Sequence, residues 1–66
     1  MQATINGEPR SFNDGSTLAA LVDTLGLDTR KIAIELNLAI VPRSLYGGTL
    51  ISEGDQIEIV QFIGGG

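Results

Sequence analysis

The chain has 66 residues and neither cysteine nor histidine, which leaves apolar packing as the main way to hold a fold together. Domains this small bury only about 60% of the surface that their unfolded chains expose, so they are marginally stable. Disulfides are excluded, and a zinc site is not expected without these ligands. A hydrophobic content of 42% makes one modest core feasible. We therefore predict a single domain over residues 1–63 and no metal site.

The charge balance is acidic, with eight Asp and Glu residues against four Lys and Arg residues. Phosphate neutralisation needs clustered cations, and only Arg30 and Lys31 are adjacent, so no nucleic-acid partner is expected. The first residues lack the pattern of a secretory signal, and no apolar run approaches the roughly 20 residues of a membrane helix. We expect a cytoplasmic protein without a membrane partner. Its acidity would serve solubility or steer it to a basic partner surface.

The first part of the sequence predicts a hairpin. Residues 1–5 alternate between apolar and polar side chains, which is the pattern of a half-buried strand. Asn6-Gly7 favours a type I′ turn into a returning strand at residues 8–12. Pro9 lacks an amide donor, so this second strand is expected at a sheet edge.

One helix follows this hairpin. Ser16 and Thr17 are both suitable N-caps, and Gly26 stands where a left-handed residue commonly ends a helix. Between them the apolar residues have the i, i+3, i+4, i+7 spacing of one helical face, formed by Leu18, Leu21, Val22 and Leu25. We expect this face to cover the sheet and to supply most of the stability.

The second half predicts three more strands. Residues 32–36 alternate, and Asn37-Leu38 can turn the chain into a strand over residues 39–41 that ends at Pro42. Residues 43–48 are expected to be irregular, with a possible 3₁₀ turn. The last strand covers residues 56–63 and follows a turn at residues 53–55.

The predicted class is therefore α+β, with a mixed sheet of about five strands in the order β-β-α-β-β-β around one helix. The first and last strands can pair in parallel at the sheet centre. This placement would explain why the last strand carries apolar residues on both faces. Ile57 and Ile59 point one way along it, and Glu58, Val60 and Phe62 point the other way.

No active site is apparent, because the chain has no imidazole base and no thiolate nucleophile. The serines are best explained by capping and turn chemistry. Glu53, Asp55 and Glu58 are interpreted as a solvated turn and strand face. Gly47-Gly48 lacks the neighbouring Lys-Ser/Thr pair of a phosphate-binding loop. We predict no catalytic residue and no bound cofactor in this chain.

The sequence ends in Gly64, Gly65 and Gly66, directly after a strongly β-forming segment. Glycine is costly to order, so residues 64–66 are expected to form a flexible tail. A tail without side chains can thread a narrow channel and bring the Gly66 carboxylate to a reagent inside a partner. Because a carboxylate is a poor electrophile at neutral pH, it would need activation, for instance as an acyl-adenylate. The plain alternative is a frayed end.

Val60 and Phe62 are the candidate docking residues. They point away from Ile57 and Ile59, and in a fold with one helix they have no core to enter. Exposed apolar residues beside a reactive end indicate a partner surface. The alternative is that Phe62 packs under residues 43–48.

Together these segments resemble the ubiquitin-like β-grasp sulfur carriers of thiamin (thiazole) biosynthesis. The resemblance covers the whole chain and rests on the Asn6-Gly7 hairpin, residues 35–44 with Val41-Pro42-Arg43, residues 53–60, and the Gly64-Gly65-Gly66 ending. The family needs only two terminal glycines, so Gly64 would be a spacer.

The resemblance implies a carrier and not an enzyme. An E1-like adenylyltransferase would use ATP to adenylate the Gly66 carboxylate, and a persulfide sulfur donor would convert it to a thiocarboxylate. Thiazole synthase would then consume that sulfur. Two other readings stay open: a sulfur carrier of the molybdopterin synthase type, and a β-grasp protein-interaction module with an inert tail.

Overall fold

The computed structural model describes residues 1–62, so Ile63 and the predicted tail at Gly64, Gly65 and Gly66 lie outside the described residues. Its elements are β1 Gln2–Ile5, β2 Glu8–Ser11, helix α1 Leu18–Thr24, 3₁₀ turn η1 Thr29–Lys31, β3 Ile32–Leu36, β4 Ala39–Val41, 3₁₀ turn η2 Arg43–Gly48 and β5 Gln56–Gln61. This order confirms the predicted β-β-α-β-β-β arrangement. The short turn η1 is an addition to it.

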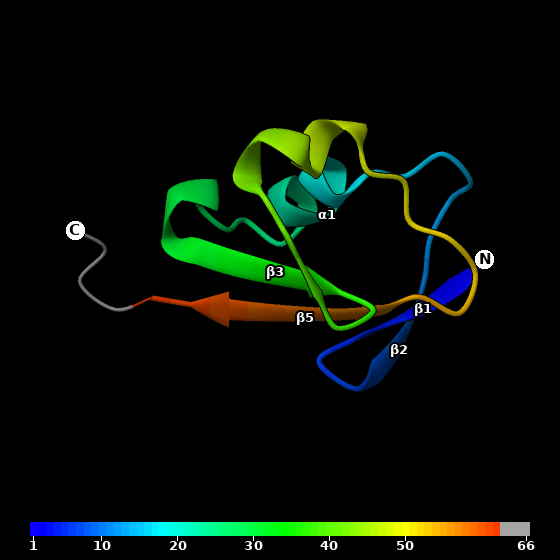
Figure 1. Cartoon of the computed structure of the whole chain (residues 1–66). Helices are drawn as coiled ribbons and strands as arrows, with labels where there is room; N and C mark the ends of the chain where they lie inside the picture. The colour runs from blue at the N-terminus through cyan, green and yellow to red at the C-terminus, as the bar shows by residue number, and fades with distance from the viewer. Residues whose placement is uncertain (63–66) are drawn as a thin grey trace.

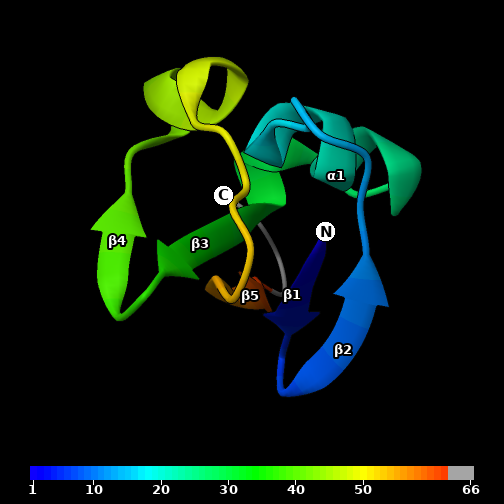
Figure 2. The same cartoon turned by 90° about the vertical axis from the view of Figure 1, so that its right-hand side faces the viewer.

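The strands form one sheet in the order β2-β1-β5-β3-β4, with α1 and η2 on the same side of it (Figures 1 and 2). The central strand β5 runs parallel to β1 and antiparallel to β3, which confirms the predicted pairing of the first and last strands. Pro9 lies in β2 at the sheet edge, as predicted. Within residues 1–62, no helix is long and apolar enough to cross a membrane.

Two similar turns connect the strands within the two hairpins. Asn6 and Gly7 have φ angles of 51° and 82°, and Asn37 and Leu38 have φ angles of 51° and 72°. Positive φ at both central positions is the type I′ geometry that suits a two-residue hairpin. Leu38 thus occupies the position that glycine fills in the first turn, although a leucine rarely adopts this conformation. Its side chain is 83% exposed.

The helix forms as predicted. The Thr17 hydroxyl accepts a hydrogen bond from the amide of Ala20 at 3.1 Å, and Gly26 has a φ of 69° just beyond the helix end. Leu18, Leu21 and Val22 are buried against the sheet, and Leu25 is only partly buried.

The core lies between α1 and the inner face of the sheet. Its buried residues are Ala3, Ile5, Leu18, Leu21, Val22, Ile32, Ile34, Tyr46, Ile51 and Ile57. Two of them come from segments for which no periodic pattern predicted burial: Tyr46 from η2, and Ile51 from the loop before β5. Both close the side of the core that the two-turn helix is too short to cover.

Candidate docking face beside the C-terminal segment

The outer face of the sheet, opposite α1, carries both predicted docking residues. Along β5 the buried Ile57 alternates with outward residues, and Val60 and Phe62 are 58% and 49% exposed. Their predicted orientation toward solvent is therefore confirmed. The space under η2 is filled by its own Tyr46, so the alternative in which Phe62 packs there is wrong. The expectation that burial on both faces explains the apolar character of β5 is also wrong, because no layer among residues 1–62 covers its outer face.

The strand register extends this outer surface beyond β5. Ala33 lies opposite Val60, and Glu35 lies opposite both Glu58 and Ile40. Residues directly opposite each other in antiparallel strands share a face. We define the docking face as the outward residues of β3, β4 and β5 together with Phe62, namely Ala33, Glu35, Ile40, Glu58, Val60 and Phe62.

Ile40 is the most exposed apolar residue of this docking face, at 75%. No sequence pattern singled it out, because Ala39, Ile40 and Val41 are all apolar and the face each one takes depends on the register with β3. Glu35 and Glu58 are a like-charged cross-strand pair, an arrangement that disfavours folding. An apolar surface with two carboxylates between its hydrophobic residues is complementary to a partner that presents apolar side chains around a cation.

The docking face ends close to the predicted tail. The amide of Phe62 donates a 2.7 Å hydrogen bond to the carbonyl of Lys31, which fixes the last described residue against η1. Phe62 precedes Gly66 by four positions in the sequence. A partner that contacts the outward Phe62 side chain would therefore also be close to the terminal glycines.

The other candidate groups take part in turns. The Glu53 carboxylate accepts a hydrogen bond from the Gln2 amide at 2.8 Å, and the Asp55 carboxylate accepts one from the Ser52 amide at 2.7 Å. The Ser16 hydroxyl donates to the Asn13 carbonyl at 2.7 Å, which is turn chemistry as expected. Across residues 1–62, no three His, Cys, Asp or Glu side chains gather in a way that could hold a metal ion.

One carboxylate has a shifted pKa. The Arg30 side chain donates hydrogen bonds to Asp28 at 3.0 and 3.1 Å, and the Arg30 amide donates another at 2.9 Å. These bonds, with the side-chain pair as the largest contribution, lower the pKa of Asp28 to about 2. Asp28 caps η1 through these bonds, and Phe62 is hydrogen-bonded to Lys31 of the same turn. The Asp28–Arg30 pair therefore has a structural role.

Known proteins share the sequence pattern and the fold of this chain. The sequence profile of the ThiS family matches residues 3–66. A thiazole synthase of Paramagnetospirillum magneticum is 52% identical over the whole chain, which spans only 20% of the length of that protein. The sulfur carrier protein ThiS of Escherichia coli is 32% identical, and the match covers 100% of both chains.

A crystal structure of the thiamine biosynthesis protein ThiS from Geobacter metallireducens has the same fold. It superposes with a TM-score of 0.78 at 31% identity and covers 100% of both chains. The expected ubiquitin-like β-grasp class, a mixed five-stranded sheet around one helix, is thereby confirmed.

Proposed function

The chain belongs to the ThiS family, and from that premise we propose that it is a sulfur carrier in the biosynthesis of the thiazole of thiamin. The observation that carries the proposal is the similarity to the sulfur carrier protein of Escherichia coli over the full length of both chains. The exposed apolar docking face supports it, because its Phe62 precedes Gly64, Gly65 and Gly66 closely in the sequence and a carrier needs a surface for its partners near its reactive group.

In the proposed cycle, the Gly66 carboxylate attacks the α-phosphate of ATP on an E1-like adenylyltransferase. This step forms an acyl-adenylate and releases pyrophosphate. The terminal sulfur of a cysteine persulfide then attacks the acyl carbon, and AMP leaves. A second thiol cleaves the resulting acyl disulfide, which leaves a thiocarboxylate on Gly66 and a disulfide on the donor side. Thiazole synthase takes the sulfur, and water restores the carboxylate.

The partners supply the catalysis in this proposal, and the chain supplies recognition and the reacting terminus. The docking face would contact the adenylyltransferase through Ile40, Val60 and Phe62. Thiazole synthase as a partner is supported by the relative of that name, a fifth of whose length corresponds to this chain. The cycle depends on cytosolic ATP and persulfide, so the proposed location is the cytoplasm.

Mass spectrometry tests the proposal. The purified chain is incubated with ATP, a persulfide-generating sulfur source and one candidate adenylyltransferase at a time. We expect a mass gain that corresponds to the replacement of one oxygen by sulfur, and only with the thiamin-pathway enzyme. The same gain with a molybdopterin-pathway enzyme alone would favour that type of carrier. An unchanged mass with every enzyme would favour the interaction module with an inert tail.

A further inference from the structure

The strand β1 leaves the central strand β5 before β5 ends. Their backbone pairing stops after Ile5 and Ile57, where the chain turns at Asn6. The Asn6 side chain extends the pairing by one step: its amide nitrogen donates to the Ile59 carbonyl at 3.3 Å, and its oxygen accepts from the Ile59 amide at 2.8 Å. Among residues 1–62, no strand lies beside β5 beyond Ile59 on the side that faces β1.

Gln61 lies in the part of β5 that no longer pairs with β1. The Phe62 amide bonds to β3 through Lys31, and alternate residues of a strand bond in opposite directions, so the backbone N–H and C=O of Gln61 face away from β3. Within residues 1–62 neither group has a hydrogen-bond partner. An unpaired strand edge of this kind is a template for an added strand.

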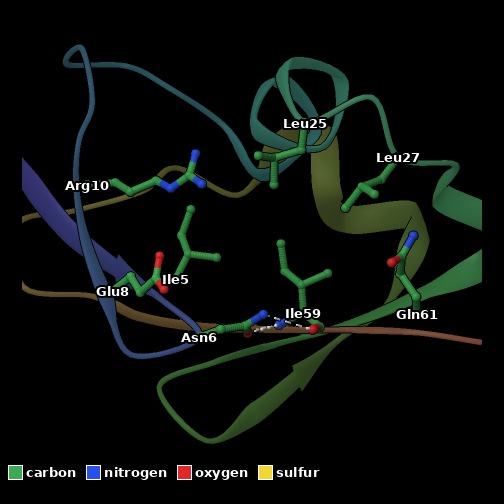
Figure 3. Close-up of a pocket in the computed structure, with 8 residues that line it drawn as sticks. All are labelled: Ile5, Asn6, Glu8, Arg10, Leu25, Leu27, Ile59 and Gln61. Carbon is green, nitrogen blue, oxygen red and sulfur yellow. Dashed lines mark hydrogen bonds between the residues drawn. The ribbon is translucent and has the colours of Figure 1, made fainter.

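A hollow of about 270 Å³ lies beside this open edge (Figure 3). It is lined by Ile5, Asn6, Glu8, Arg10, Leu25, Leu27, Ile59 and Gln61. Leu25, Leu27 and Ile59 are apolar and only partly buried, so a side chain placed between them would bury more apolar surface. Arg10 stands at the end of the hollow away from Gln61 and forms no ion pair with any residue in the described part of the chain.

From this arrangement we infer that the hollow and the Gln61 edge together bind an extended segment of thiazole synthase, which adds to β5 as a strand. The segment pairs with the free N–H and C=O of Gln61, places an apolar side chain between Leu25 and Leu27, and presents a carboxylate to Arg10. This is strand addition: backbone bonds supply affinity, and the side-chain pockets supply specificity. The groove lies on the helix side of the sheet, so it is distinct from the outer docking face.

The choice of occupant rests on the proposed function. Gln61 lies five positions before Gly66, so a strand paired there holds the segment that leads to the reacting group in an extended conformation. The enzyme that consumes the sulfur needs such positioning, and relatives exist in which a region like this chain is part of a thiazole synthase. The edge at Gln61, the apolar hollow and the Arg10 side chain thus all favour an extended peptide segment as the ligand.

Amide hydrogen exchange tests the inference. The ¹⁵N-labelled chain is measured alone and with saturating thiazole synthase from the same organism, an enzyme without a carrier region of its own. Gln61 should exchange at least about tenfold more slowly in the complex, because its N–H gains an acceptor. The backbone N–H of Val60 points toward β3, so its protection should already be present in the free chain. Val60 therefore serves as the internal control.

A matched pair of substitutions at the same position supplies the second measurement. Gln61→Pro removes the N–H, whereas Gln61→Ala removes only the side chain, and neither changes a hydrogen bond of the described fold. We expect Gln61→Pro to weaken binding to thiazole synthase about tenfold, as the loss of one hydrogen bond in an interface does, and Gln61→Ala to bind as the parent does. Equal loss in both variants would overturn strand addition.

The remaining outcomes are equally decisive. Binding with unchanged Gln61 exchange would overturn the groove while leaving the carrier function intact. Protection that appears with the adenylyltransferase and not with thiazole synthase would overturn the assigned partner. Protection in the free chain that disappears when residues 63–66 are deleted would identify the chain's own end as the occupant. Normal thiocarboxylate formation without any binding to thiazole synthase would contradict both the groove and the proposed recipient of the sulfur.

Discussion

The side-chain amide of Asn6 pairs with the backbone of Ile59 as a peptide group of a neighbouring strand would. It both donates to the Ile59 carbonyl and accepts from the Ile59 amide, at 3.3 and 2.8 Å. The residue that turns the first hairpin therefore also ties this hairpin to the central strand. One asparagine meets two demands, a positive φ and a two-sided hydrogen bond, and no other side chain of its size meets both.

Replacement of Asn6 by glycine separates these two roles. Glycine keeps the positive φ of the turn and loses both hydrogen bonds to Ile59. We expect Asn6→Gly to lower the free energy of unfolding by about 1–3 kcal/mol, measured by urea denaturation. Asn6→Asp is the comparison: it keeps the acceptor for the Ile59 amide but faces the Ile59 carbonyl with a negative charge. Equal stability of Asn6→Gly and the parent would mean that the turn geometry alone matters.

A substitution in the turn of the second hairpin is expected to increase stability. Leu38 has a φ of 72°, where a non-glycine residue is disfavoured by roughly 1–2 kcal/mol. Leu38→Gly should therefore raise the free energy of unfolding by about 1 kcal/mol, less the entropy that glycine adds to the unfolded chain. Gly7→Leu makes the opposite change in the matching turn and should destabilise. A lower melting temperature for Leu38→Gly would show that the exposed leucine makes contacts that stabilise the fold.

The largest loss of stability is expected from a substitution in the buried face of the helix. Leu21 is buried in the middle of the stripe, and removal of such a side chain costs about 2–5 kcal/mol. A core this small rarely supplies more than about 3–5 kcal/mol, so Leu21→Ala should be largely unfolded at physiological temperature. Leu50→Ala, at an exposed position, is the control and should fold normally. Dispersed amide NMR signals from Leu21→Ala at that temperature would contradict the prediction.

The docking face predicts a loss of binding without a loss of stability. Phe62 is half exposed and lies outside the core cluster, so Phe62→Ala should leave the melting temperature nearly unchanged. It should weaken binding to the adenylyltransferase about tenfold or more, as aromatic residues at interface centres do. Leu50→Ala again serves as the exposed apolar control. A large fall in melting temperature would instead mean that Phe62 mainly stabilises the domain.

The terminal glycines predict a loss of chemistry without a loss of folding. Deletion of Gly66 withdraws the carboxylate by about 3.3–3.6 Å, one extended residue. An error near 1 Å can already cost on the order of 100-fold in rate, so the shortened chain should fold but support no adenylation. Gly65→Val and a chain with one bulky residue added after Gly66 should fail for steric reasons. Pyrophosphate exchange with the adenylyltransferase measures all three, and normal exchange by the shortened chain would refute the role of Gly66.

Most of the fold could be predicted because its signals are local. The Asn6-Gly7 turn, the helical stripe from Leu18 and the alternation along β3 each depend on neighbouring residues. The parallel pair at the sheet centre was predicted from the apolar residues on both faces of the last strand, although one of these faces is exposed. The outer face of the sheet could be predicted only in part, because the position of Ile40 on that face depends on the register between β3 and β4.

Features that arise between distant segments were beyond the sequence. Tyr46 and Ile51 each follow an exposed leucine, Leu45 and Leu50, so no period marked them as core. The free edge at Gln61 depends on where β1 leaves β5, and this position is set by the hydrogen bonds of Asn6 across more than 50 residues of chain. The shifted pKa of Asp28 depends on the local conformation of η1, which no propensity in the sequence indicated.

The central position of β5 has a mechanical consequence. The strand that leads to the terminal glycines is held by β3 from Ile57 to Gln61 and by β1 at Gln56 and Ile57, and its Ile57 is anchored in the core. A force applied along the C-terminal segment therefore loads both ladders in shear, and more hydrogen bonds must break together than for an edge strand, which has one neighbour. A pull on the end of the chain is therefore expected to move the domain as a rigid handle and not to unravel it.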